Sequence, residues 1–106
     1  MTEYVKEIEL AGISVRITQG ALASAVGRGG DLFVWAVRAR CCGRPGRLVV
    51  AHERPEGREF ALEWSEPGLR LHLQSNLGRL PETIDIDSRG RSGRIEAYWD
   101  GCAWIT

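Results

Sequence analysis

The chain has 106 residues, of which 43% are hydrophobic and 26% charged, and its 14 basic and 14 acidic residues give a formal net charge of zero. A chain of this length and composition forms a folded globular protein with one modest core. Balanced charge argues against a dedicated nucleic-acid binder, and no apolar run approaches the ~20 residues that cross a bilayer. We therefore expect a single domain over residues 1–106, with neither nucleic acid nor membrane as a partner.

The first half of the chain predicts a strand or short hairpin, one short helix and a long strand. Apolar and polar residues alternate over residues 7–17 around a central Ala-Gly pair, which is typical of strands with one buried face. Thr18 is a good helix N-cap residue, and apolar residues at helical spacing follow it up to Gly27, a C-terminal stop signal. After a Gly-rich turn, the segment Leu32 to Arg40 is the strongest strand prediction in the chain. Its alternation predicts burial on both faces at its start and one polar face near its end.

The second half predicts several short strands separated by turns. Predicted strands span Leu48 to Glu53, Glu59 to Trp64 and Leu69 to Leu73, and the segments between them contain Pro and Gly. One short helical turn is predicted at residues 77–80, and residues 83–99 have the pattern of a closing hairpin. No internal repeat is visible. We therefore expect a mostly β fold with minor α+β character, a compact single domain of about seven short strands with one short helix.

The charged residues of the closing hairpin give a weaker signal. Asp85 and Asp87 alternate on one strand face, about 7 Å apart, which favours a solvated face over a catalytic dyad. Arg89, Arg91 and Arg94 lie near them at the hairpin tip. Local charge balance is their expected role, and contact with phosphates is the alternative.

Two of the three cysteines, Cys41 and Cys42, are adjacent where the long predicted strand gives way to a Gly-Arg-Pro-Gly turn. Residues 1–7 show no basic segment followed by a long apolar run, so we expect no signal peptide and a cytoplasmic location. In that compartment an odd number of cysteines predicts free thiols or metal ligands rather than a disulfide framework.

Arginines surround this cysteine pair. Arg38 and Arg40 precede Cys42 on its own strand face, and Arg44 and Arg47 follow in the turn. Cations near a thiol favour the thiolate, which is the form that binds metals and attacks electrophiles. Arg38, Arg40 and Arg44 are also candidate anion-binding residues, because a guanidinium pairs well with carboxylate or phosphate. Strand alternation separates the two thiols: it places Cys41 in the core and Cys42 in the arginine-lined turn.

Two further residues could complete a metal site with Cys42. Cys102 lies in a tail with two tryptophans, and this tail either reaches a site formed elsewhere or docks in an apolar groove. His52 belongs to a predicted return strand beside the cysteines, so it is a candidate extra ligand, with an ordinary packed or surface role as the alternative. The candidate metal ligands are therefore Cys42, Cys102, Cys41 and His52.

The order of these pieces resembles the HesB/IscA-type (A-type) iron–sulfur carrier family. Residues 17–22 are similar to the start of the family's helix, and Cys42 falls where the family has its first conserved cysteine. The other matching segments are Leu32 to Arg40, Leu48 to Glu53, Glu59 to Trp64, Leu69 to Leu73, Leu77 to Leu80 and Thr83 to Asp87. The family's tail carries a Cys-Gly-Cys-like motif, where this chain has Cys102 alone. The resemblance implies a HesB-like fold that binds iron or an iron–sulfur cluster through Cys42 and Cys102, with Cys41 or His52 assisting, across a homodimer.

These features predict carriage of a metal or cluster rather than turnover of a substrate, so we expect no enzymatic activity. The first alternative is a non-enzymatic interaction domain that kept a HesB-like fold and lost its metal ligands, with the four tryptophans forming a partner groove. The second alternative is a thiol-based redox or soft-metal sensor, because two adjacent cysteines lie among arginines. The expected partner is another protein or a second copy of the chain, and the interaction-domain alternative needs no cofactor.

Overall fold

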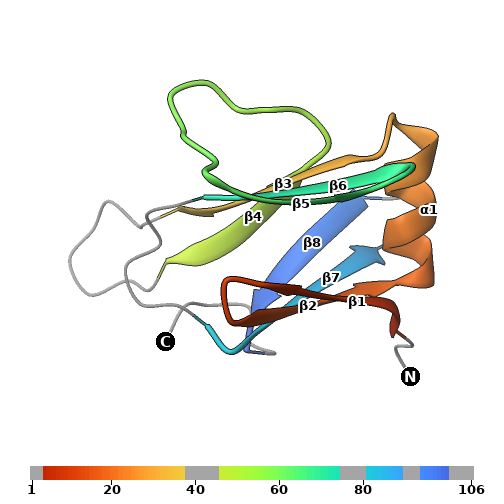
Figure 1. Cartoon of the computed structure of the whole chain (residues 1–106), viewed down its shortest axis with the longest axis horizontal. Helices are drawn as coiled ribbons and strands as arrows, with labels where there is room; N and C mark the ends of the chain where they lie inside the picture. The colour runs from red at the N-terminus through yellow and green to blue at the C-terminus, as the bar shows by residue number, and fades with distance from the viewer. Residues whose placement is uncertain (1–3, 38–45, 75–80, 90–93, 101–106) are drawn as a thin grey trace.

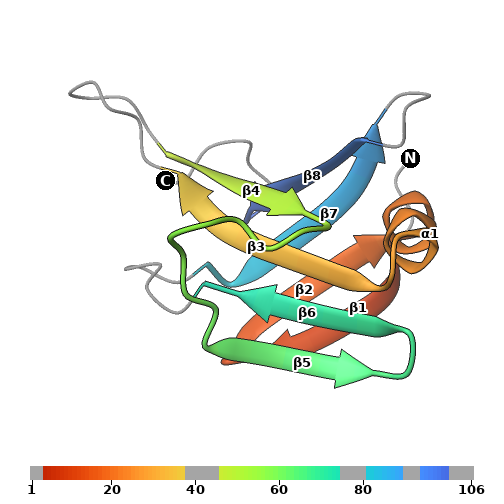
Figure 2. The ribbon, with the colours of Figure 1, turned by 90° about the horizontal axis from the view of Figure 1, so that it is seen from above.

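The computed structural model describes residues 4–37, 46–74, 81–89 and 94–100, and the structural statements below refer to these residues. Within them, eight strands form two four-stranded sheets that face each other (Figures 1 and 2). The first sheet has the order β1-β2-β7-β8 and the second the order β4-β3-β6-β5. The strands are β1 (Tyr4–Leu10), β2 (Ile13–Thr18), β3 (Asp31–Val37), β4 (Arg47–Ala51), β5 (Leu62–Glu66), β6 (Leu69–Leu73), β7 (Thr83–Arg89) and β8 (Arg94–Trp99).

The two halves of the chain repeat one topology. Each sheet consists of two antiparallel hairpins joined by a central parallel pair, which is β2 with β7 in the first sheet and β3 with β6 in the second. If β1, β2, β3 and β4 exchange places with β5, β6, β7 and β8, respectively, the strand order of each sheet becomes that of the other sheet. The described strands therefore follow a pseudo-two-fold arrangement in which each half supplies one hairpin to each sheet. The sequence shows no repeat because the halves share the order of their strands and not the identity of most residues.

Helix α1 (Gln19–Gly27) carries the chain from the first sheet to the second and covers one open end of the sandwich (Figure 1). Thr18 is its N-cap, and the Thr18 hydroxyl oxygen accepts a hydrogen bond from the Ala21 N–H at 3.3 Å. The small side chains of Ala21 and Ala25 are fully buried, which lets the helix lie close to the sheets. The predicted helix, with its N-cap at Thr18 and its end at Gly27, is confirmed.

Apolar side chains from both sheets fill the space between them. On β6, Leu69, Leu71 and Leu73 are at most 2% exposed, whereas Arg70 and His72 lie on the opposite, outer face, as the alternation of the sequence predicts. The largest fully buried side chains are Trp99, Ile8, Ile13, Ile17, Leu32, Leu71, Leu73, Ile84, Ile86, Val15 and Val34. This layer is the hydrophobic core of the domain.

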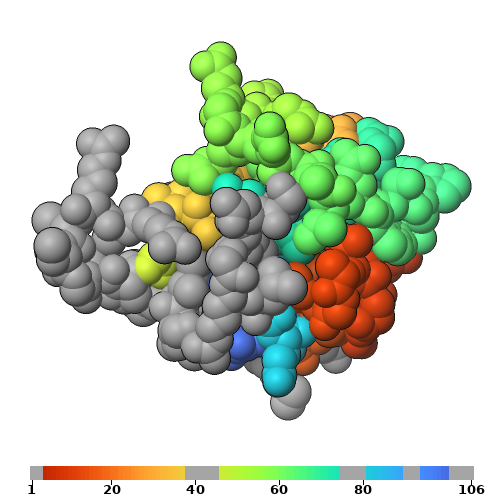
Figure 3. Space-filling model, turned by 60° about the vertical axis from the view of Figure 1, so that its left-hand side comes forward, coloured from red at the N-terminus to blue at the C-terminus, as the bar shows by residue number. Residues whose placement is uncertain are grey.

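The loop of residues 52–61 covers the outer face of the second sheet, and Figure 3 shows it standing above that face. On this face Phe33 stacks on His72, with ring centroids 4.3 Å apart, and Phe60 from the loop meets Phe33 edge-on at 5.3 Å. The Arg54 guanidinium lies 5.2 Å from the centre of the Phe33 ring. These contacts confirm that β3 is buried on both faces at its start.

The prediction of a mostly β fold with one short helix is confirmed, with eight described strands rather than about seven. The strand predicted at Glu59 to Trp64 is wrong in position, because β5 is formed by Leu62–Glu66. Two features explain the shift. Phe60 packs on Phe33 instead of pairing in the sheet, and the tight turn after Glu66 sets the pairing of β5 with β6.

Other predicted boundaries differ less. β4 ends at Ala51, two residues before the predicted limit of Glu53, and β3 is described as far as Val37. The helical turn predicted at residues 77–80 and the predicted continuation of β3 to Arg40 lie outside the described residues.

The expectation of a solvated face at Asp85 is wrong. Asp85 is 4% exposed, and its two carboxylate oxygens accept hydrogen bonds from Arg16 Nε at 2.7 Å and Nη2 at 2.9 Å. The carboxylate of Asp87 accepts a hydrogen bond from the Thr18 hydroxyl at 2.9 Å. Both partners come from β2, the parallel neighbour of β7, so these carboxylates are paired within the sheet.

Candidate functional site

Most of the residues predicted to form a site lie outside the described residues. These are Cys41, Cys42, Cys102, Arg38, Arg40 and Arg44. Within the described ranges, no group of three or more His, Cys, Asp or Glu side chains is placed to hold a metal ion. Iron or iron–sulfur binding therefore stays a prediction from the sequence.

His52 is the one predicted ligand that the structure describes, and it follows β4 directly. Its Nε2 lies 3.1 Å from the Ser24 hydroxyl on α1. Its Nδ1 is buried and makes no hydrogen bond of good geometry with the described residues. The nearby Asp31 backbone acts to raise the pKa of His52, but this is the smallest of the three influences on it. Burial lowers the pKa of His52 below its ordinary value of 6.5, and the positive charge of Arg28 lowers it further. His52 is therefore a largely neutral imidazole at pH 7, with one ring nitrogen engaged by Ser24.

The imidazole of His52 lies at one end of a groove of about 790 Å³. We call this the β4–β8 groove, because its described lining consists of Arg28, residues 47–53 and residues 94–98. β4 is an edge strand of the second sheet and β8 is an edge strand of the first. The two strands lie side by side at one corner of the sandwich in both ribbon views, but they do not pair (Figures 1 and 2). The groove thus brings together one edge of each sheet, and neither edge pairs with any other described strand.

The described arginines divide into a first group whose side chains have partners and a second group whose side chains have none among the described residues. The first group contains both ion-paired and ring-stacked arginines. Arg16, Arg70 and Arg89 form ion pairs with carboxylates. The guanidinium groups of Arg54 and Arg58 lie over aromatic rings.

The second group is Arg28, Arg47 and Arg94, and all three line the β4–β8 groove. Each is exposed, and none forms an ion pair, a hydrogen bond through its side chain or a ring contact within the described part of the chain. The described arginines that have no partner among the described residues therefore all line one groove. Arg94 does not provide the predicted charge balance for Asp85, because the Asp85 carboxylate is paired with Arg16.

Two glutamates also line the groove, and one of them is already engaged. Glu96 accepts a hydrogen bond from the Tyr98 hydroxyl at 2.7 Å and pairs with Arg89 at 3.2 Å. Burial and this hydrogen bond raise the pKa of Tyr98 above its ordinary value of 10.0, so the phenol stays a donor. Glu53 is exposed at the end of the groove near His52. The unengaged charge of the lining is therefore mostly positive.

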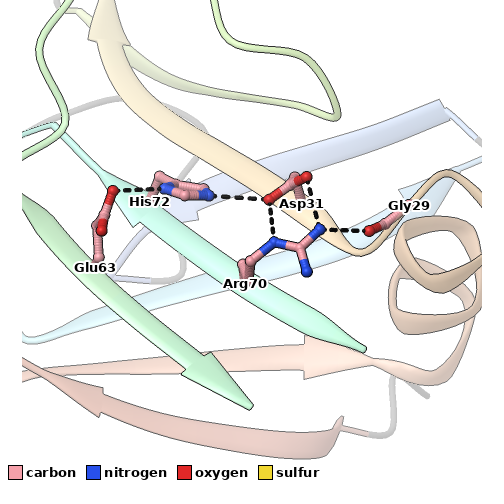
Figure 4. A network of polar contacts seen from close by, with 5 residues as sticks. All are labelled: Gly29, Asp31, Glu63, Arg70 and His72. Carbon is pink, nitrogen blue, oxygen red and sulfur yellow. Dashed lines mark hydrogen bonds and ion pairs between the residues drawn. The ribbon is translucent and has the colours of Figure 1, made fainter. Parts of the chain in front are cut away.

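A second polar cluster lies on the outer face of the second sheet, where β3, β6 and β5 run side by side (Figure 4). Arg70 donates to both carboxylate oxygens of Asp31, at 2.7 and 3.0 Å, and to the Gly29 carbonyl at 2.7 Å. The two ring nitrogens of His72 lie 3.1 Å from Asp31 and 3.1 Å from Glu63. The hydrogen bonds from Arg70 and His72 lower the pKa of Asp31 from 3.8 to about 2. The polar groups of this cluster bond to one another and so cross-link three strands.

Each of the three described tryptophans packs against other residues of the domain and does not line the β4–β8 groove. Trp99 is 1% exposed and belongs to the core. Trp35 meets Phe60 edge-on, and Trp64 packs against the core with Lys6 above its ring. The fourth tryptophan, Trp104, lies outside the described residues.

Sequence reasoning missed the β4–β8 groove because no local pattern marks it. Arg47 and Arg94 belong to different hairpins and line one groove only through the packing of one sheet against the other. The available signal was the position of each arginine at or just before the start of a predicted strand, which became informative only once the two strands were known to be edges.

Comparison with family models, with curated proteins and with solved structures gives no match. The resemblance to HesB/IscA-type carriers therefore stays a prediction. Among the described residues, no helix is long and apolar enough to span a membrane.

Proposed function

We propose that this domain is a non-enzymatic interaction domain that binds an extended segment of a partner polypeptide in the β4–β8 groove. The observation that carries the proposal is the meeting, at one groove, of two strand edges that pair with no other described strand. A strand edge offers a row of backbone N–H and C=O groups, and an added strand satisfies them with main-chain hydrogen bonds.

The dimensions of the groove support this class of ligand. Its volume of about 790 Å³ lies in the range of specific ligand sites. β4 has 5 residues and β8 has 6, so a partner strand of similar length would lie along either edge. Half-buried side chains on both strands, among them Val49 and Ile95, offer apolar contacts to alternate residues of such a segment.

The contact of Ser24 with His52 has the distance of a nucleophile and its base. However, Ser24 lies within α1 and is not part of the described groove lining. No described side chain orients the His52 ring through Nδ1, as the third member of a triad does. These features favour binding over catalysis.

The test is an amide shift map of the ¹⁵N-labelled full chain. The probes are three peptides of about eight residues in which valine alternates with glutamate, serine or lysine, a pattern suited to a strand. We expect at least one peptide to shift the amides of β4 and β8 while leaving β1 and β5, the edges at the opposite corner, unchanged. No shift at β4 and β8 with any peptide, or equal shifts at β1 and β5, would contradict the proposal.

A further inference from the structure

We infer that the segment bound in the β4–β8 groove is acidic and that its carboxylates pair with Arg28, Arg47 and Arg94, an inference that rests on the proposed function. The arginines carry it. Each of the other described arginines has a carboxylate or an aromatic ring as partner, whereas these three have neither and share one groove.

The positions of two of these arginines set a length scale. Arg47 is the first residue of β4, and Arg28 lies near His52, which follows the last residue of β4. β4 covers four residue steps from Arg47 to Ala51, about 13 Å, with His52 one step further, and residues four apart on a strand point to the same face. A partner strand along β4 that carries two acidic residues four positions apart would therefore reach both cations at once.

The acidic groups of the groove do not cancel this preference. Glu96 is held by Tyr98 and Arg89, so it is not free to neutralise Arg94. Glu53 remains, against three unpaired guanidinium groups. A guanidinium can bind a carboxylate through two parallel hydrogen bonds, which gives orientation as well as attraction.

A nucleic-acid backbone is the other polyanion that arginines bind, but the groove favours a polypeptide. The chain has a net charge of zero, and two glutamates line the groove, both of which weaken attraction to a long phosphate chain. The strand edges also offer backbone donors and acceptors that an added strand matches and a phosphate chain does not.

The experiment is calorimetric titration of the full chain with four probes. Three are peptides of about eight residues built from valine, serine and threonine: one with two glutamates four positions apart, one with two glutamates three positions apart, and one with two lysines four positions apart. The fourth is a single-stranded oligothymidylate of similar length. We expect the first peptide to bind about tenfold more tightly than any other probe, with affinity falling as salt rises from about 0.05 to 0.5 M.

Charge-reversal variants locate the binding. Arg28→Glu, Arg47→Glu and Arg94→Glu should each weaken binding of the first peptide about tenfold, whereas Arg54→Glu, on the outer face of the second sheet, should not change it. The amide spectrum of each variant checks its fold. Equal binding of the lysine peptide, tighter binding of the oligothymidylate, or indifference to all three groove variants would overturn the inference, and the amide shift map then tests groove binding separately. If no peptide binds, the proposed function fails with it.

Discussion

Arg16 on β2 and Asp85 on β7 form a two-point ion pair across the central parallel strands of the first sheet, at 2.7 and 2.9 Å. Arg70 on β6 and Asp31 on β3 form the same contact across the central parallel strands of the second sheet, at 2.7 and 3.0 Å. Arg70 follows Arg16 by the same number of residues as Asp85 follows Asp31. The pseudo-two-fold arrangement of the strands thus extends to this pair of side chains, at equivalent places in the two sheets.

The two ion pairs differ in burial, and this difference predicts unequal contributions to stability. Asp85 is 4% exposed, whereas the Asp31 side chain is 31% exposed. Arg16→Gln should lower the free energy of unfolding by about 1–3 kcal/mol, because it leaves a buried carboxylate without its partner. Arg70→Gln should cost less, because water can replace the lost contact. Urea denaturation of both variants measures the difference, and an equal or larger loss for Arg70→Gln would contradict the expected order.

Asp31 should make the domain sensitive to strong acid. Its pKa is lowered from 3.8 to about 2 by Arg70 first and by His72 second. A carboxyl group whose pKa is lower in the folded chain contributes stability that is complete above pH ~4 and is lost as the pH falls toward ~2. In Asp31→Asn, the free energy of unfolding should therefore fall less steeply over this window than in the wild type. Urea titrations at several pH values across the window check this, and parallel pH curves would show that Asp31 is not the titrating group.

The turn between α1 and β3 contains adjacent glycines that form a matched pair for substitution. Both have positive φ angles, +98° at Gly29 and +88° at Gly30. A Cβ at Gly29 would meet nothing within 4 Å, whereas a Cβ at Gly30 would collide with the Gly68 carbonyl oxygen. Gly29→Ala should cost about 1 kcal/mol through backbone strain alone. Gly30→Ala should cost at least about 1 kcal/mol more, because backbone atoms must move. Thermal denaturation of the two variants makes the comparison, and similar losses would show that this approach to Gly68 is not tight.

Groove binding should not depend on the thiols. None of the described residues that line the β4–β8 groove is a cysteine. We therefore expect a variant with Cys41, Cys42 and Cys102 all changed to serine to fold and to bind the acidic peptide as the wild type does. Calorimetry with that peptide decides the matter, and a large loss of affinity in a folded triple variant would link the binding site to the cysteines.

The sequence prediction of iron binding has its own measurement. If Cys42 and Cys102 hold an iron–sulfur cluster, anaerobic reconstitution with iron and sulfide should produce visible charge-transfer absorption. That absorption should be absent from Cys42→Ser and from Cys102→Ser. A colourless wild-type protein free of iron would remove this prediction.

Local chemistry explains which parts of the structure were predictable. Thr18 caps the helix through its own hydroxyl, and alternation along Leu69–Leu73 is a property of one strand, so both are visible in a short window of sequence. By contrast, the burial of Asp85 depends on Arg16, which lies 69 residues away and is brought near by parallel pairing of β2 with β7.

The same reasoning applies to the groove and to the polar cluster. Arg47 and Arg94 are far apart in the sequence. They line the same groove only because β4 lies beside β8 at one corner of the sandwich. The position of His72 between Asp31 and Glu63 requires three strands in register. These contacts follow from the order of strands in the sheets, which local patterns do not determine.

The most direct test of the groove as a binding site is the amide shift map of the full chain with the peptide that carries two glutamates four positions apart. Binding in the groove predicts saturable shifts centred on residues 47–53 and 94–98, and their loss in Arg47→Glu. Shifts that are absent there, or that centre on β1 and β5 at the opposite corner, would contradict it.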